Sequence, residues 1–138
     1  MEVMGAMTNA KSKKSKAEKL LTEVELEMMN ILWAKGSATV NDVQRALSPE
    51  RKLAYTSIST MLRILEQKGI LASRKEGRGH VYFPKLEKHE YETRSLHHLV
   101  NNVFAGAPAQ LVQRLLEVES LSEKELSDIK KILNERQG

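Results

Sequence analysis

Residues 54–84, AYTSISTMLRILEQKGILASRKEGRGHVYFP, decide the fold of this chain of 138 residues. The stretch predicts a helix, a first strand, a turn rich in glycine and basic residues at 76–79, and a second strand that Pro84 ends. Lys68-Gly69 supplies the cation and the conformationally free residue that close a helix. A basic hairpin directly after a helix is typical of a winged helix. The alternative at this point is an ordinary helix and hairpin with a solvated turn.

The helix in this stretch has an apolar side and a polar side. The apolar side is formed by residues spaced i, i+3, i+4 and i+7, namely Ile58, Met61, Leu62 and Leu65. At ~100° per residue, the opposite side carries short hydroxyl side chains together with Arg63 and Gln67. Arginine pairs with guanine edges, and serine and threonine pair with several base edges, so this side suits the major groove of DNA.

Two shorter helices are predicted before this stretch. A capping box at residues 22–25 opens a helix that ends at Lys35-Gly36, and a second box at residues 39–42 opens a helix that Ser48-Pro49 ends. Between them, residues 37–39 can form an extended segment that pairs with the hairpin. The order of helix, short segment, helix, longer helix and hairpin is that of a winged helix-turn-helix, whose third helix enters the DNA.

Composition and charge limit the class of protein. Cysteine is absent, which excludes disulfides and thiolate chemistry, and no apolar run reaches the ~20 residues that span a bilayer. No signal peptide is visible at the N-terminus, so we expect a cytoplasmic protein that does not enter a membrane. The net charge is +4, and the segment 51–85 alone has eight basic and two acidic residues. This local excess lies on the predicted helix and hairpin, where a polyanion would bind.

The chain divides into three predicted parts. Residues 1–19 form a lysine-rich, disordered tail, residues 20–86 a winged-helix DNA-binding domain, and residues 87–138 a helical dimerisation domain. The predicted fold class is therefore mainly α with a small β-hairpin: a winged helix-turn-helix followed by a C-terminal region of three helices.

The three C-terminal helices are short and amphipathic, and about fifty residues cannot bury their apolar stripes alone. We expect them to pack against a second copy of the chain, because the winged helix already has a core. A helical extension folded back on its own domain is the alternative. A symmetric dimer would present two heads to a two-fold DNA site. The residues predicted to form the dimer contact are Leu96, Leu99, Val100, Val103, Phe104, Leu111, Leu115, Leu126, Ile129, Ile132 and Leu133.

The predicted DNA contacts fall into two groups. Groups on the polar side of the helix would contact base edges, at Thr56, Ser57, Ser59, Thr60 and Arg63. Cationic and aromatic groups around them would hold phosphates, at Lys52, Tyr55, Arg74, Lys75 and Arg78, with His80 beside the DNA backbone.

No catalytic site is predicted. The sequence has no Ser, His and Asp grouping, no paired carboxylates and no zincin spacing. His97 and His98 point about 100° apart on a helix and make a poor metal chelate. The glycines at 77 and 79 lie in a hairpin rather than before a helix, where a phosphate-binding loop would be. We therefore expect no enzyme activity, no metal site and no cofactor.

The chain resembles the penicillinase repressor (BlaI/MecI) family of bacterial transcriptional repressors over about residues 20–133. The segments that carry the likeness are 21–27 and 31–33 for the first helix, 54–69 for the recognition helix, 77–82 for the wing and 121–133 for the last helix. No single motif is unique, but the full set in this order is specific. The resemblance implies a homodimer that binds a palindromic double-stranded operator, with the C-terminal helices of the two subunits interlocked.

The resemblance also implies how DNA binding ends. In the penicillinase branch, a membrane sensor-protease pathway leads to cleavage of the repressor in its dimerisation helix, which makes a regulatory protease a candidate partner. Another branch releases DNA on binding copper through C-terminal cysteines, which this chain lacks. A winged-helix adaptor that binds protein, and a ligand-sensing regulator, are the remaining alternatives. The segment that matches the cleaved one is Asn101, Asn102, Val103 and Phe104, with Asn102-Val103 in place of an Asn-Phe bond.

Overall fold

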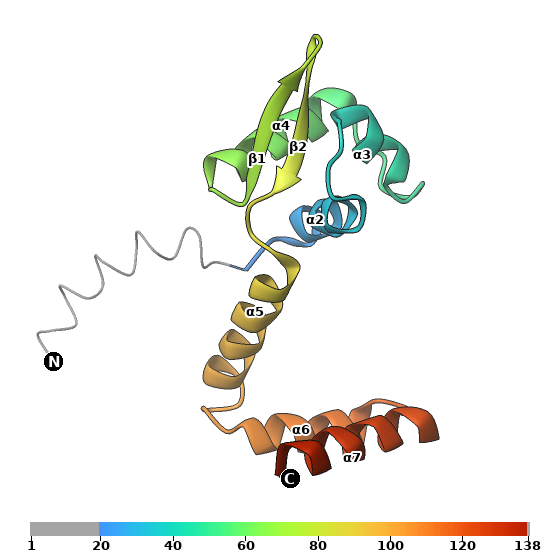
Figure 1. Cartoon of the computed structure of the whole chain (residues 1–138), viewed down its shortest axis with the longest axis vertical. Helices are drawn as coiled ribbons and strands as arrows, with labels where there is room; N and C mark the ends of the chain where they lie inside the picture. The colour runs from blue at the N-terminus through green and yellow to red at the C-terminus, as the bar shows by residue number, and fades with distance from the viewer. Residues whose placement is uncertain (1–19, 138) are drawn as a thin grey trace, which may run out of the picture. The chain divides into compact units, whose positions relative to one another are not determined.

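The computed structural model describes residues 20–137, so the predicted tail at residues 1–19 lies outside the described part. The chain forms helices and one antiparallel hairpin, which confirms the predicted fold class (Figure 1). The chain divides into two compact units, an N-terminal unit up to Ser95 and a C-terminal unit from Leu96, and each is described by itself. In chain order the elements are α2 (Glu23–Lys35), α3 (Val40–Ala46), α4 (Tyr55–Gln67), β1 (Leu71–Glu76), β2 (Gly79–Pro84), α5 (Lys88–Asn102), α6 (Pro108–Val118) and α7 (Glu123–Gln137).

The first two helices begin at the predicted capping boxes. The Thr22 hydroxyl accepts a hydrogen bond from the Glu25 amide at 3.2 Å, and the Glu25 carboxylate accepts one from the Thr22 amide at 2.9 Å. Thr39 and Asp42 make the same pair of bonds at 3.1 and 3.0 Å. Because these bonds satisfy amides that have no partner within the helix, each cap stabilises its helix by about 1 kcal/mol. Gly36 then ends α2 with a φ of 85°.

Helix α4 buries the apolar side that its sequence predicts. Ile58, Leu62 and Leu65 are fully buried, whereas Met61 is only partly buried. The helix begins without a side-chain cap, so its first amides are left for other acceptors. Gly69 follows the helix with a φ of 82°, the left-handed conformation expected at this end.

Strands β1 and β2 pair along their full length, from Leu71 opposite Pro84 to Glu76 opposite Gly79. The loop between them has two residues, and the first, Gly77, has a φ of 60°. A left-handed residue at this position lets a two-residue loop follow the twist of the strands, and glycine adopts it without strain. The glycine-rich turn predicted from the sequence is thus a tight hairpin loop.

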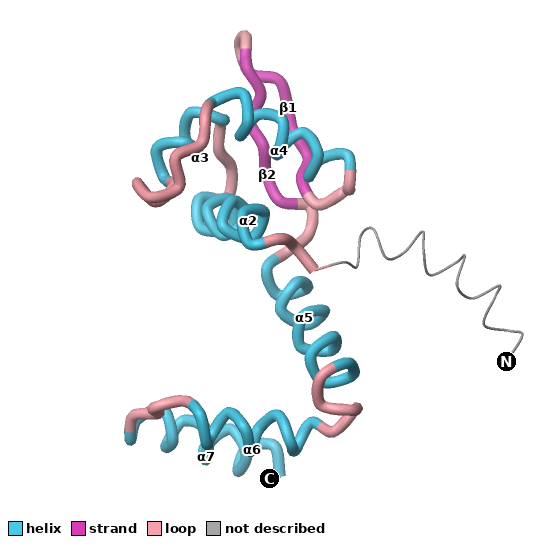
Figure 2. Tube along the Cα trace, turned by 180° about the vertical axis from the view of Figure 1, so that it is seen from behind, coloured by secondary structure: helices cyan, strands magenta, loops and turns pink. Residues whose placement is uncertain are grey.

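A short segment before α3 adds to the hairpin. The Ala38 amide donates to the Tyr82 carbonyl at 2.9 Å, and the Tyr82 amide donates to the Ala38 carbonyl at 2.8 Å. This confirms the predicted pairing of residues 37–39 with the hairpin. Figure 2 shows the loop between α2 and α3 running beside β2 at this point.

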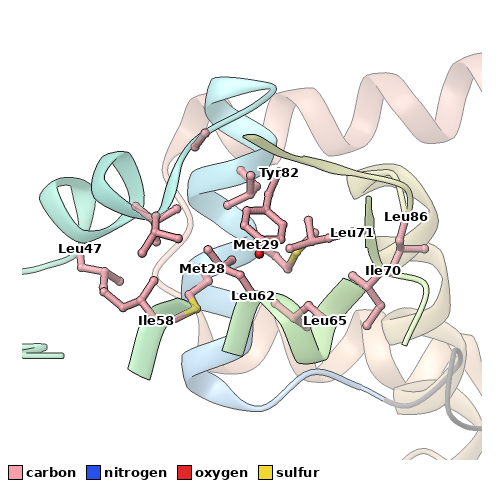
Figure 3. Packing of buried hydrophobic residues seen from close by; sticks show 14 of the residues in the cluster. Met28, Met29, Leu47, Ile58, Leu62, Leu65, Ile70, Leu71, Tyr82 and Leu86 are labelled. Carbon is pink, nitrogen blue, oxygen red and sulfur yellow. The ribbon is translucent and has the colours of Figure 1, made fainter. Parts of the chain in front are cut away.

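The core of the N-terminal unit is formed by side chains from α2, α3, α4 and the hairpin (Figure 3). Met28, Met29 and Leu32 of α2 are fully buried in it. Leu26 and Ile31 of the same helix are only partly buried and pack against this core.

The first half of α5 also belongs to the N-terminal unit. Tyr91 is 9% exposed, and its ring packs against Trp33 with the ring centroids 5.7 Å apart. The Tyr91 hydroxyl accepts a hydrogen bond from the Leu21 amide at 3.0 Å. Because these contacts fix the start of α5, the compact unit continues to Ser95, past the boundary predicted at residue 86.

The C-terminal unit has a different character. Helices α6 and α7 contain no buried residue, and Ile132 and Leu133 are 62% and 55% exposed. The local signals agree with the sequence: Pro108 lies in the first turn of α6, and Ser122 and Glu125 form the capping box of α7 with bonds of 3.3 and 3.1 Å. The helices therefore form as predicted, but one chain leaves their apolar stripes uncovered.

Candidate nucleic-acid interface

Helix α4 presents two rows of polar side chains. One row lines a groove between the helix and the hairpin and consists of Tyr55, Ser59, Arg63 and Glu66. The second row is exposed about a quarter of a turn further round the helix and consists of Thr56, Thr60 and Gln67. Arg63 lies at the border between the rows. Of the residues predicted to contact base edges, Thr56 and Thr60 therefore lie in the second row, Arg63 at the border and Ser59 in the first row.

The groove between α4 and the hairpin has a volume of about 570 Å³. Its lining is polar and mixed in charge, with two arginines and two glutamates, so the groove itself is close to neutral. The remaining polar side chains are hydroxyls, one amide and one imidazole. Besides the row on α4, the lining residues are Thr39, Val40, Asn41, Ser73, Glu76, Arg78, Gly79, His80, Val81 and Tyr82.

The face of the hairpin that lies toward α4 carries Lys75 and His80. Side chains alternate along a strand, so Ser73 and Lys75 share one face of β1, and their partners across the hairpin are Tyr82 and His80. Ser73 is hydrogen-bonded to α4. This bond identifies the face toward the helix and places Lys75 and His80 on it.

Arg74 points to the opposite face of the hairpin. Its guanidinium forms an ion pair with Glu76 at 2.7 Å and lies over the Phe83 ring, 5.8 Å from the ring centroid. The sequence predicts the same phosphate-binding role for Arg74 and Lys75, but only Lys75 lies on the side of α4. Arg74 is instead part of a local cluster on the back of the hairpin.

Ion pairs reduce the positive charge that the sequence suggests for this surface. Arg51 pairs with Glu27 at 3.1 Å, and Lys68 pairs with Glu25 at 3.1 Å. Both acidic partners come from α2, outside the segment in which the charges were counted. The cations of the predicted site that form no ion pair within residues 20–137 are Lys52, Arg63, Lys75 and Arg78.

Glu25 links the start of α2 to the end of α4. The residue is only 9% exposed, and this burial by itself would raise the pKa of the carboxyl group. Hydrogen bonds from the Thr22 amide and from Lys68 outweigh burial, so the pKa of Glu25 is lowered overall. The carboxylate is therefore charged at neutral pH. In that form it caps α2 and holds the end of α4 against the core.

Glu66 makes a second link, between α4 and the hairpin. Its carboxylate oxygen Oε2 accepts a hydrogen bond from the Ser73 hydroxyl at 2.7 Å. Tyr82 lies beside this pair: burial and the charge of Glu66 raise the pKa of the phenol, and Arg63 acts in the opposite direction. None of Glu66, Ser73 and Tyr82 was predicted as a site residue, because their meeting depends on a contact between two elements.

The residues predicted to contact DNA are all open to solvent except Ser59, which is partly buried. Lys52 precedes α4, and Ser57 lies on the far side of the second row, so neither faces the groove. The structure brings five of the predicted residues together around the groove: Tyr55, Ser59, Arg63, Arg78 and His80.

The residues predicted to join two chains all lie in the C-terminal unit, which begins at Leu96. Those that are exposed are Leu96, Leu99, Val103, Leu115, Leu126, Ile132 and Leu133. Those that are partly buried are Val100, Phe104, Leu111 and Ile129. In the segment matched to the cleaved one, Asn101 and Asn102 end α5, and Val103 and Phe104 lie in the turn that follows.

Two other kinds of site can be checked over residues 20–137. Within this range, no group of three or more acidic or histidine side chains is placed to hold a metal ion. None of the helices in the same range is both long and apolar enough to cross a membrane.

Comparison with known proteins gives consistent matches. Residues 21–135 match the family model for the penicillinase repressor. The chain is 32% identical over 118 residues to the penicillinase repressor of Bacillus licheniformis, covering 86% of this chain and 92% of that protein. It is 27% identical over 116 residues to the methicillin resistance regulatory protein MecI of Mammaliicoccus sciuri, covering 84% and 94%. A solution structure of monomeric Bacillus licheniformis BlaI with the blaP half-operator is similar at a TM-score of 0.45, with 37% identity and coverage of 51% of this chain and 87% of that chain.

Proposed function

The chain belongs to the penicillinase repressor family, and on that premise we propose that it is a sequence-specific transcriptional repressor that binds double-stranded DNA. The observation that carries the proposal is one surface of the N-terminal unit. There, the polar side of α4 lies beside a hairpin whose helix-facing side carries cations without ion pairs. A helix of this kind enters the major groove, and the hairpin beside it meets the DNA backbone.

The two parts of this surface have different roles in the proposal. Thr56, Thr60 and Arg63 would contact base edges and give the choice of sequence. Lys75 and Arg78 on the hairpin would contact phosphates and give affinity that falls as salt rises. The polar side of α4 has one arginine and no lysine, so hydroxyl and methyl contacts carry much of the sequence preference.

We propose a homodimer that binds a palindromic operator. Apolar side chains that one chain leaves uncovered on α5, α6 and α7 support this arrangement, because a second copy would cover them. Two heads related by a two-fold axis fit two half-sites related in the same way. A repressor that binds operator DNA acts in the cytoplasm of a bacterial cell, which is where we place the protein.

We further propose that cleavage of the chain by a protease releases it from DNA. The segment after α5 supports this, because Val103 is 64% exposed and follows the last turn of the helix. A cut there would separate the DNA-binding head from α6 and α7. The affinity that comes from joining two heads would then be lost.

The decisive experiment is selection of bound duplexes from a random pool by the full chain, followed by titration at several salt concentrations. We expect a palindromic sequence and an affinity that falls steeply with salt. The matched control is the double variant Lys75→Ala with Arg78→Ala, which should keep the sequence preference but bind less tightly. A chain that shows no salt-sensitive duplex binding would contradict the proposal and favour a protein-binding adaptor.

A further inference from the structure

We propose that Glu66 is a positioning residue for DNA binding: through Ser73 it ties the hairpin to α4 and holds the hairpin cations beside the base-reading side of the helix. This inference rests on the proposed function. It concerns a residue that would not itself touch DNA.

The geometry of the link is specific. The Ser73 hydroxyl donates to Glu66 Oε2 at 2.7 Å, a length typical of a strong bond to a charged acceptor. Glu66 lies in the last turn of α4, and Ser73 is the third residue of β1. Over residues 20–137, no other side-chain hydrogen bond or ion pair connects α4 with the hairpin.

The Glu66–Ser73 bond lies between the packed base of the hairpin and its exposed tip, a position from which it can hold the tip in place. Below it, Leu71 and Tyr82 are buried in the core with Leu62 and Leu65, so the base of the hairpin is held by packing. Beyond it, every residue from Arg74 to His80 is exposed. A two-stranded ribbon without a packed face is marginally stable in water. On β2, Val81 is still buried at 8%, so the Glu66–Ser73 bond is the last side-chain hydrogen bond between α4 and the hairpin before the exposed residues of the tip.

The tip carries the polar groups whose placement matters, among them the cations Lys75 and Arg78. Lys75 and His80 form a cross-strand pair on the side of α4, and Arg78 lies in the loop. If the tip moves freely, these groups must be ordered when DNA binds, and ordering costs affinity. A fixed tip has these cations in place before the duplex arrives.

The charge of Glu66 makes the proposal easy to test, because a positioning role and a purely electrostatic role predict opposite results. A carboxylate that lines a groove near DNA repels phosphates, so its removal alone should strengthen binding. If Glu66 holds the hairpin, removal should weaken binding. Glu76 provides the matched comparison: it is a lining residue of the same groove and carries the same charge, but its carboxylate pairs with Arg74 on the back of the hairpin rather than bonding across to α4.

The experiment measures binding of the full chain to a duplex selected from a random pool. We expect Glu66→Ala and Ser73→Ala each to weaken binding about 3- to 10-fold, the size of the net contribution of one typical hydrogen bond. The double variant should be no weaker than either single one. Glu66→Gln keeps an acceptor for Ser73 and should bind within about twofold of the parent chain. Glu76→Gln should bind as tightly as the parent or more tightly.

A readout that a purely structural role would not change is the salt dependence. When the tip is released, phosphate contacts are lost, so the slope of log affinity against log salt should fall by about 1 in Glu66→Ala. In a chain that already carries Lys75→Ala and Arg78→Ala, Glu66→Ala should have little further effect. The thermal midpoint of each variant shows that the N-terminal unit stays folded.

The outcomes separate the two proposals. If the parent chain binds no duplex, the proposed function fails and the role of Glu66 fails with it. If the parent binds and Glu66→Ala binds equally well or better, the positioning role alone is overturned. It is also overturned if the Glu66→Ala loss is unchanged in the chain without the hairpin cations. If Glu66→Ala does not fold, Ser73→Ala gives the same comparison with a smaller change.

Discussion

The two units of this chain differ in how they cover their apolar side chains. The N-terminal unit encloses Met28, Leu32, Leu62 and Leu65 completely within one chain. The C-terminal unit forms α6 and α7 with no buried residue in either helix. Both units have good caps and amphipathic helices, so local signals do not explain the difference. A single chain accounts for the stability of the first unit, whereas the second requires a further surface to cover it.

The largest expected effect comes from the core of the N-terminal unit. Leu62→Ala should lower its free energy of unfolding by about 2–5 kcal/mol, because the side chain is fully buried and leaves a cavity. Leu133→Ala in α7 is the matched change at a site that is 55% exposed in one chain. In denaturant unfolding followed by the fluorescence of Trp33, the midpoint should fall for Leu62→Ala and stay unchanged for Leu133→Ala. Equal shifts would remove the distinction between the units.

The next effect tests what covers the C-terminal unit. Ile132→Asp should raise the dimer dissociation constant about 100-fold or more, because a carboxylate placed in an apolar contact loses its hydration. The neighbouring change Lys131→Asp introduces the same side chain beside it and should have a much smaller effect. Sedimentation measures both. A monomeric parent chain at micromolar concentration would contradict the dimer contact directly.

The third prediction assigns base reading to the N-terminal unit. Arg63→Ala should cost about 1–3 kcal/mol of binding to the selected duplex and far less with random DNA, because a guanidinium contact with a base edge is lost. Titration of both duplexes gives the difference. The same loss on both would place Arg63 on phosphates instead.

A smaller effect concerns the link between α2 and α4. Glu25→Gln should lower the free energy of unfolding by about 1–2 kcal/mol at neutral pH, since it weakens both a cap and an ion pair. The folded-state pKa of Glu25 is lowered, so its contribution is complete above the unfolded-state value of about 4.3 and disappears as pH falls through the folded value. The difference between Glu25→Gln and the parent should therefore shrink in acid. A difference that is constant down to pH ~3 would rule out this linkage.

The smallest effect compares the two faces of the hairpin. Lys75→Ala should weaken duplex binding and lower the salt slope by about 1, because Lys75 lies on the side of α4. Arg74→Ala removes the same charge from the other face, where Glu76 already pairs with it, and should leave the slope nearly unchanged. Reversed results would mean that DNA approaches the back of the hairpin.

Features that depend on residues close together in the sequence could be predicted, whereas features that depend on contacts between distant elements could not. The boxes at residues 22–25 and 39–42, the buried stripe of α4 and the end at Gly69 depend on a few neighbouring residues, and all are as predicted. The burial of Met28 is set by the elements that pack against α2, which its local sequence does not show. The packing of the start of α5 depends in the same way on a contact of Tyr91 with Trp33, which is far away in sequence.

The candidate site shows the same division. The sequence identifies the basic and hydroxyl residues, but treats Arg74 and Lys75 as equals, because the register of the hairpin decides which face each occupies. It also overstates the local charge, since the partners of Arg51 and Lys68 lie on α2. The Glu66–Ser73 bond joins α4 to the hairpin, and no spacing of residues in the sequence predicts it.

The most direct test of the account is the stoichiometry of the complex, measured by native mass spectrometry of the full chain alone and with the duplex selected from the random pool. The account predicts two chains in the free protein and two chains on one duplex, with Ile132→Asp giving single chains when free. A parent chain that is single when free, or that forms no complex with any duplex, would contradict it.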